Sequence, residues 1–99
     1  MAVLFISEHP ELVVFQGGTG QALSEPPIAE QTVAIGGTSA QSSAFNDKTR
    51  FVRIHTDAIC SILFGADPTA TTAKKRLAAN QTEIFRVQPG HKVAVITNT

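Results

Sequence analysis

The sequence predicts an all-β fold, a small β-sandwich or jelly-roll-like domain of about seven or eight short strands. Valine, isoleucine and threonine recur in short runs, and their branched side chains favour extended backbone. Gly, Pro, Asn and Asp separate these runs at spacings of about ten residues, as in sandwiches. The chain has 99 residues and carries no internal repeat or break in composition. We therefore expect one domain over residues 1–99.

The first half of the chain predicts three strands, over residues 2–6, 11–15 and 28–35. Glycines at 17, 18 and 20 indicate a turn, and the paired prolines at 26 and 27 stiffen an extended segment. Residues 17–27 are therefore the expected mobile loop. Gly36 and Gly37 close the third strand.

The clearest strands of the second half are expected over residues 49–56 and 58–64. In the first, Val52, Ile54 and Thr56 face one way and alternate with polar and aromatic residues. The second is nearly all apolar, as expected of a strand buried on both faces. Asp57 lies between them, so the pair is either a tight hairpin or one bent strand.

The remaining elements alternate between turns and strands. Residues 65–68 give a strong turn signal, and residues 69–76 read as a polar loop. Strands are predicted over residues 82–88 and 91–97, divided at Pro89-Gly90. The only helix candidate, residues 72–79, is short and carries no apolar stripe.

Composition narrows the classes of function. Charged residues make up 16% of the chain, well below the usual quarter, and the formal net charge is zero. A global basic field for nucleic acid is therefore absent. Trp and Tyr are also absent, which argues against sugar-stacking and base-stacking sites. A surface poor in charge suits a protein that is packed against a partner.

No set of residues predicts chemistry. The glycine turn at 17–20 lacks the Lys-Ser/Thr of a phosphate loop. The three histidines, His9, His55 and His91, form no His-x-His pair, and His55 is expected in a surface charge cluster with Arg53 and Asp57. The single cysteine, Cys60, lies in an apolar run and is expected to be buried. We therefore expect no catalytic residues, no cofactor, no metal and no internal disulfide, and we expect the protein not to be an enzyme.

The second half resembles small structural proteins of tailed-phage virions, some of which are capsid cement or decoration proteins. The similar segments are RFVRIHTDA (50–58), Cys60, FGADPTATT (64–72), LAA (77–79), E-x-F-x-V-x-P-G (83–90) and KVAVI (92–96). They lie within residues 31–96, and they are turn-and-strand patterns rather than chemical motifs. The resemblance implies a jelly-roll-like protein of the capsid exterior that binds the major capsid protein and bridges its subunits. Another virion part (tail, head-completion or fibre-base protein) and a small host- or carbohydrate-binding module are the alternatives.

The expected contacts with a partner lie in two places. Residues 1–15 are apolar yet broken by Pro10, so they form either a contact arm or an ordinary first hairpin of the core. The basic run at 74–76 is either a solvated loop or a contact for an acidic partner. The candidate contact residues are Val3, Leu4, Phe5, Ile6, Leu12, Val14, Phe15, Lys74, Lys75 and Arg76.

The remaining expectations concern assembly and location. A short, neutral chain with little charge is expected to self-associate as a dimer or trimer. No contact with nucleic acid or membrane is expected. The apolar residues 1–6 are too few for a signal peptide, so synthesis in a host cytoplasm is expected before incorporation into the virion.

Overall fold

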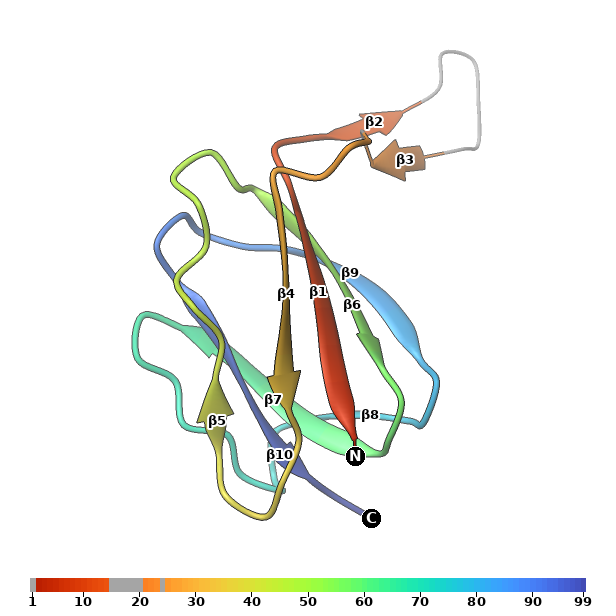
Figure 1. Ribbon diagram of the computed structural model, residues 1–99, viewed down its shortest axis with the longest axis vertical. Coiled ribbons are helices and arrows are strands. Elements are labelled where there is room, and N and C mark those ends of the chain that lie inside the picture. The colour runs from red at the N-terminus through yellow and green to blue at the C-terminus, as the bar shows by residue number, and fades with distance from the viewer. Residues whose placement is uncertain (1, 15–20, 24) are drawn as a thin grey trace.

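The computed structural model describes residues 2–14, 21–23 and 25–99, and these residues form ten strands and no helix (Figure 1). Eight of the strands make two antiparallel sheets of four, and the remaining two make a separate hairpin. The predicted all-β sandwich is therefore confirmed. The predicted turn over residues 17–20 lies outside the described residues, as does part of the expected loop.

The first sheet has the strand order β4-β1-β6-β9. Its strands are β1 (Val3–His9), β4 (Ala29–Ala34), β6 (Phe51–Thr56) and β9 (Thr82–Arg86). β1 pairs along its length with β4 on one side and with β6 on the other. The first strand of the chain is therefore a central strand of this sheet.

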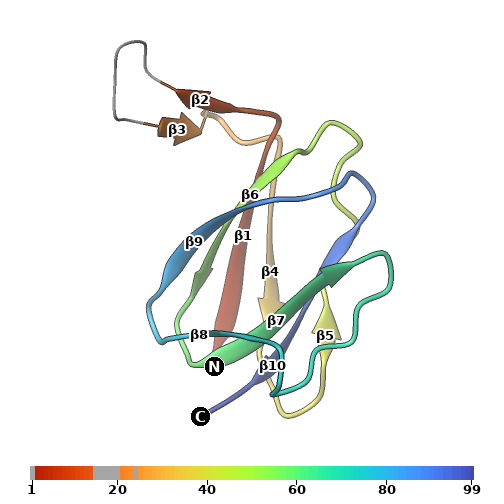
Figure 2. The ribbon, with the colours of Figure 1, turned by 180° about the vertical axis from the view of Figure 1, so that it is seen from behind.

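The second sheet has the strand order β5-β10-β7-β8. Its strands are β5 (Ala40–Gln41), β7 (Cys60–Gly65), β8 (Lys75–Leu77) and β10 (Lys92–Thr97). A hairpin of β2 (Leu12–Val14) and β3 (Gln21–Leu23) extends beyond one end of the sandwich (Figures 1 and 2).

The pairing follows a jelly-roll wrap. β7 pairs with β8, β6 with β9 and β5 with β10, so each pair encloses the previous one along the chain. This is the order in which the strands of one long hairpin would pair. Alternate pairs fall in opposite sheets, which is how a jelly roll divides its strands. β4 is the next strand outward, and its partner is β1 from the start of the chain. If the series continued along the chain, the partner of β4 would be a strand that follows β10. β1 occupies that position instead.

The core lies between the inner faces of the two sheets. Leu4 and Ile6 of β1 and Val52 and Ile54 of β6 meet the side chains of the other sheet there. The rest of the core comprises Val33, Ile35, Phe45, Cys60, Ile62, Leu77, Val87, Val93 and Val95. The predicted alternation in residues 49–56 is confirmed, because Val52, Ile54 and Thr56 are all buried.

Two local expectations are wrong. Residues 72–79, the short helix candidate without an apolar stripe, form no helix, as the all-β prediction required, because Lys75–Leu77 pairs with β7 as strand β8. The same pairing means that the basic run is not wholly a loop. β6 and β7 are not a tight hairpin, since they lie in different sheets and the chain crosses between the sheets at residues 57–59. There Asp57 Oδ1 accepts a hydrogen bond of 2.8 Å from the Val3 backbone N–H.

Candidate protein-binding surface

The apolar candidate residues of β1 divide between the two faces of its sheet. Leu4 and Ile6 are 0% and 1% exposed and lie in the core, so the structure contradicts their assignment as contact residues. The physical reason is the two-residue period of a strand, which alternates side chains across the sheet. Val3 is partly buried, whereas Phe5 is 45% exposed on the outer face. Only Val3 and Phe5 of this group remain available to a partner.

The interpretation of residues 1–15 as a contact arm is wrong for Val3–His9. A strand that pairs on both sides and fills the core cannot leave the domain to reach a partner. Of the other candidates in this segment, Leu12 and Val14 belong to β2, and their side chains lie outside the described part of the chain, as does all of Phe15.

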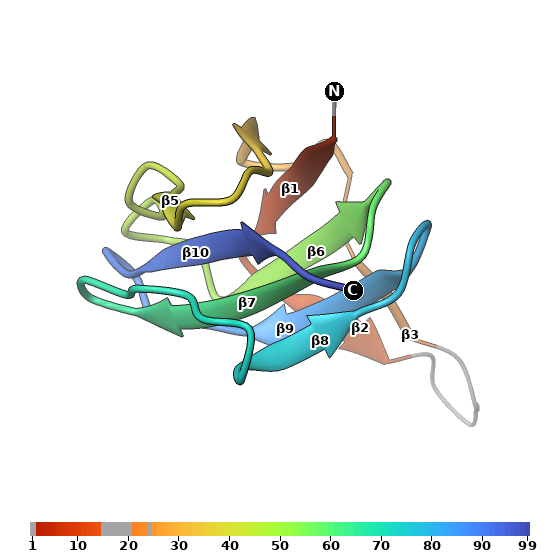
Figure 3. The ribbon, with the colours of Figure 1, turned by 90° about the horizontal axis from the view of Figure 1, so that it is seen from below.

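The three basic candidates, Lys74, Lys75 and Arg76, are exposed at the β8 edge. The last strands of the two sheets, β8 and β9, lie on the same side of the sandwich (Figure 3). A shallow groove runs between them, lined by Lys75, Arg76, Leu77, Gln81, Glu83 and Phe85. The Lys75 ammonium lies over the Phe85 ring, with its Nζ 5.5 Å from the ring centroid.

The outer face of the second sheet is covered by the chain itself. The segment of residues 66–74 leaves β7, passes β5 and β10 and returns as β8 (Figure 2). Gln41 of β5 donates to the Pro68 carbonyl at 2.7 Å, and Asn98, just after β10, donates to the Thr72 carbonyl at 3.2 Å. Ala94 and Ser61, which point to this outer side, are 0% exposed. This cover explains why β7 is buried on both faces at its start, as its apolar run predicted.

The outer face of the first sheet has no such cover among the described residues. Its register sets Thr32, Phe5, His55 and Thr82 side by side across the four strands. The Phe5 and His55 rings are 6.2 Å apart between centroids, and His55 Nδ1 lies 2.7 Å from Thr82 Oγ1. Ile84 lies on the same face and is 49% exposed. These are the two large hydrophobic side chains that the described residues leave exposed.

Ile84 was not among the residues selected from the sequence. The sequence pattern that could have indicated it is the alternation in residues 82–87. Phe85 and Val87 face one way, and Ile84 lies among polar residues on the other face, with Thr82 and Arg86. A single exposed isoleucine is common in proteins, and it gains meaning here because the register brings it to the face that carries Phe5. The expected salt-linked cluster of Arg53, His55 and Asp57 is absent, since no ion pair joins these three described residues.

A buried carboxylate lies at the end of β1. Glu8 is 2% exposed, and its Oε1 accepts hydrogen bonds of 2.8 Å from the Thr49 hydroxyl and from the Asn46 N–H. Its Oε2 accepts a bond of 3.2 Å from Gln31 Nε2. These contacts tie β1, β4 and the segment before β6 together, which is a structural role.

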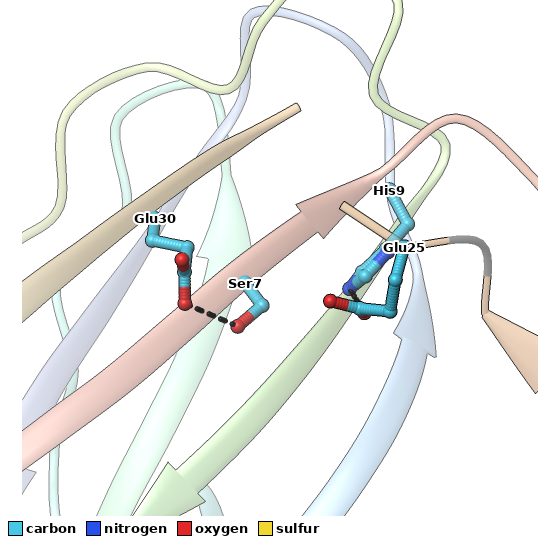
Figure 4. A network of polar contacts seen from close by, with 4 residues as sticks. All are labelled: Ser7, His9, Glu25 and Glu30. Carbon is cyan, nitrogen blue, oxygen red and sulfur yellow. Dashed lines mark hydrogen bonds and ion pairs between the residues drawn. The ribbon is translucent and has the colours of Figure 1, made fainter. Parts of the chain in front are cut away.

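The neighbouring polar side chains of β1 are shown in Figure 4. Ser7 on the outer face donates to Glu30 Oε2 of β4 at 3.5 Å. His9 is buried, and its Nε2 lies 3.8 Å from Glu25 Oε2 in the segment that returns from the hairpin. Both contacts bind β1 to the chain that follows it.

The chemically reactive side chains are dispersed. Among the described residues, no group of three or more His, Cys, Asp or Glu side chains is placed to hold a metal ion. Burial raises the pKa of the Cys60 thiol, which donates to Thr56 Oγ1 at 3.5 Å, and the charge of Asp57 acts in the same direction as burial. The predicted burial of Cys60 is confirmed, because the residue is 0% exposed.

Comparison with known proteins adds no assignment. No family model, curated protein or solved structure matches this chain. Within the described residues, no helix is long and apolar enough to cross a membrane. The uncovered sheet face and the β8–β9 groove are therefore the features from which a function is inferred.

Proposed function

We propose that this protein is a non-catalytic binding module, and specifically a capsid decoration protein that sits on the exterior of a phage head and bridges capsid subunits. The observation that carries the proposal is the difference between the two sheet faces. One face is covered by residues 66–74 of the same chain, whereas the other leaves Phe5 and Ile84 open to solvent.

The open face has the composition of a protein contact. Phe5 and Ile84 would supply apolar area, which contributes about 25 cal/mol per Å² buried before the cost of association. Arg53, Arg86 and Glu30 surround them as exposed charges of both signs. An apolar centre within a polar rim is typical of protein interfaces. The occupant we propose is the major capsid protein.

The dispersed reactive groups support binding rather than catalysis. The Cys60 thiol lies in the core, and its raised pKa opposes formation of a nucleophilic thiolate. His55 lies on the open face, but its nearest polar contact is the Thr82 hydroxyl rather than a carboxylate that would orient it as a base. We therefore propose that the protein lacks enzymatic activity.

Co-sedimentation with expanded shells of the phage major capsid protein encoded nearest to this chain tests the proposal. The variant is Phe5→Glu, which places a charge at the centre of the open face on a side chain that the core does not need. Thr71→Glu is the matched control, since Thr71 is exposed on the segment that covers the other sheet. We expect the native chain and Thr71→Glu to sediment with the shells and Phe5→Glu to stay in solution while remaining folded.

Two results would overturn the proposal. Failure of the native chain to bind the shells would exclude the decoration role. Equal binding by the native chain and Phe5→Glu would show that the shell is contacted elsewhere than on the open face.

A further inference from the structure

Strand β9 leaves one full backbone edge unpaired. In the ladder with β6, the Val87 N–H donates to the Arg50 carbonyl and the Thr56 N–H donates to the Gln81 carbonyl. Antiparallel ladders use alternate residues, so Glu83 and Phe85 also pair toward β6. The N–H and C=O groups of Thr82, Ile84 and Arg86 therefore point away from the sheet, and none of these groups bonds to a described backbone group.

The other edges of the two sheets offer less room. β5 and β8 have only two and three residues. The β4 edge is flanked by β5 and by the segment after it, and the Gln31 amide bonds to both the N–H and the carbonyl of Ser43. By contrast, no described strand lies beyond β9, which forms the margin of the molecule in Figures 1 and 2. An exposed edge of this length is a template for another strand.

The sequence of β9 is complementary to itself. Ile84 is the central residue of Thr82–Arg86, so an antiparallel copy centred there sets Ile84 against Ile84 and Thr82 against Arg86. These are the residues whose backbone groups point outward, and each such pair can exchange both of its hydrogen bonds. The two exposed isoleucine side chains would then cover each other on the outer face.

Charges on the inner side are complementary in the same register. Glu83 of one copy falls opposite Phe85 of the other, and Lys75 lies over that Phe85 ring with its Nζ 5.5 Å from the centroid. The Glu83 carboxylate would thus meet the Lys75 ammonium of the other copy, and the two-fold axis repeats the contact. Both side chains line the β8–β9 groove, so the inward-facing side chains of the second strand would lie beside it.

We propose that two copies of this chain form a symmetric dimer by antiparallel pairing of β9 with β9 about Ile84, with Glu83 of each copy paired to Lys75 of the other. The pairing joins the two four-stranded sheets into one. It is isologous, so it closes at two copies. Phe5 lies on β1, away from β9, and stays exposed in such a dimer, so the inference does not depend on what the open face binds there.

A mixing experiment tests the charge pair between copies. One variant is Lys75→Glu and the other is Glu83→Lys. Each alone sets like charges together across the axis, whereas a mixture of the two restores both pairs in a heterodimer. We expect native mass spectrometry to show a dimer for the native chain, monomers for each variant alone and a heterodimer for the mixture.

Net charge alone could draw the two variants together, so a control pair carries the same charges elsewhere. Lys48→Glu and Asp47→Lys change exposed residues before β6, which neither belong to β9 nor line the β8–β9 groove. Each of these should form homodimers like the native chain and show no preference for the heterodimer. A heterodimer preference equal to that of the β9 pair would overturn the proposed contact.

A second variant tests the backbone pairing. Ile84→Pro removes an N–H that points away from β6, so the ladder within the chain keeps its bonds while the central pair of the dimer is lost. Sedimentation equilibrium should show the dimer dissociation constant rising by at least about 30-fold. An unchanged constant in folded Ile84→Pro, a trimer, or a native chain that stays monomeric at high concentration would each refute the β9 dimer.

Discussion

Replacement of Glu8 by alanine should destabilise the fold by about 2–4 kcal/mol. The carboxylate is buried and accepts from the Thr49 hydroxyl, the Asn46 N–H and Gln31 Nε2. Alanine removes the acceptor of all three donors. Thr49 is 0% exposed, so water cannot easily replace the carboxylate at its hydroxyl, whereas Asn46 is exposed and can be hydrated.

The loss of stability in Glu8→Ala depends on which of the three donors water can reach once the carboxylate is gone. A hydrogen bond to a charged acceptor contributes about 1.5–3 kcal/mol net. The Thr49 bond should lose most of that value, and the other two should lose a smaller part because solvent reaches them. Glu8→Gln should cost less, about 1–2 kcal/mol, since its carbonyl can still accept from Thr49 and Asn46. Its amide N–H groups would face Gln31 Nε2, which cannot flip without losing its bonds to Ser43.

Urea denaturation of single and double variants measures these values. Thr49→Val removes the hydroxyl at nearly constant volume, so its cycle with Glu8→Ala should give a coupling energy of about 1 kcal/mol or more. Glu30→Gln is the control, because Glu30 is exposed and holds Ser7 only at 3.5 Å, and it should change stability by less than about 0.5 kcal/mol. A cost below about 1 kcal/mol for Glu8→Ala, or additive effects with Thr49→Val, would refute the structural role of the carboxylate.

Three further predictions concern the core and its turns. The Cys60 thiol should react slowly with a water-soluble disulfide reagent until urea is added, and equal reaction rates with and without urea would contradict its burial. Because burial raises the pKa of this thiol in the folded state, the free energy of unfolding should fall as pH rises above the ordinary thiol pKa of about 8.5, and Cys60→Ala should lack this decline. Gly90 has φ +78°, which disfavours a side chain although a Cβ added there would meet nothing within 4 Å, so Gly90→Ala should lower the free energy of unfolding in urea by about 1 kcal/mol. Asn80 has φ 61°, so Asn80→Gly should be neutral or stabilising. A neutral Gly90→Ala would mean that the turn adapts. Deletion of residues 1–9 should abolish cooperative thermal unfolding measured by circular dichroism, because β4 and β6 lose the strand between them; a cooperatively folded product would show that β1 is dispensable.

Much of the strand pattern could be predicted from local sequence. Residues 49–56 alternate cleanly, and the structure places Val52 and Ile54 in the core as the alternation required. The burial of Cys60 followed from its apolar neighbours. These predictions succeeded because the side chains of a strand alternate between its two faces, so consecutive residues show which face is buried.

The position of β1 could not be predicted in this way. Residues 2–6 and 11–15 look like successive strands of a hairpin, yet β1 pairs with β4 and β6 and not with β2. Strand pairing is non-local, and nothing in the side chains of Val3–His9 specifies which later strands will flank it. The same limit hid the role of Lys75–Leu77, whose basic residues resemble a loop but pair with β7 as the last strand of a sheet.

The size of outward-facing side chains carries a signal that local alternation does not. Where residues 66–74 cover the second sheet, the outward-facing residues that are fully buried are small, Ser61 on β7 and Ala94 on β10, so a neighbouring segment can approach the backbone closely. The cover is itself built from small or ring-closed residues, and Pro68 and Ala70 are its buried members. On the first sheet an outward position of the central strand β1 holds Phe5, which would keep such a segment away from the strands. Small outward-facing side chains therefore indicate a sheet face covered by its own chain, and a large one such as Phe5 indicates an open face. This signal can be used only when the strand arrangement is known, because only then are Ser61 and Ala94 seen to lie on one face.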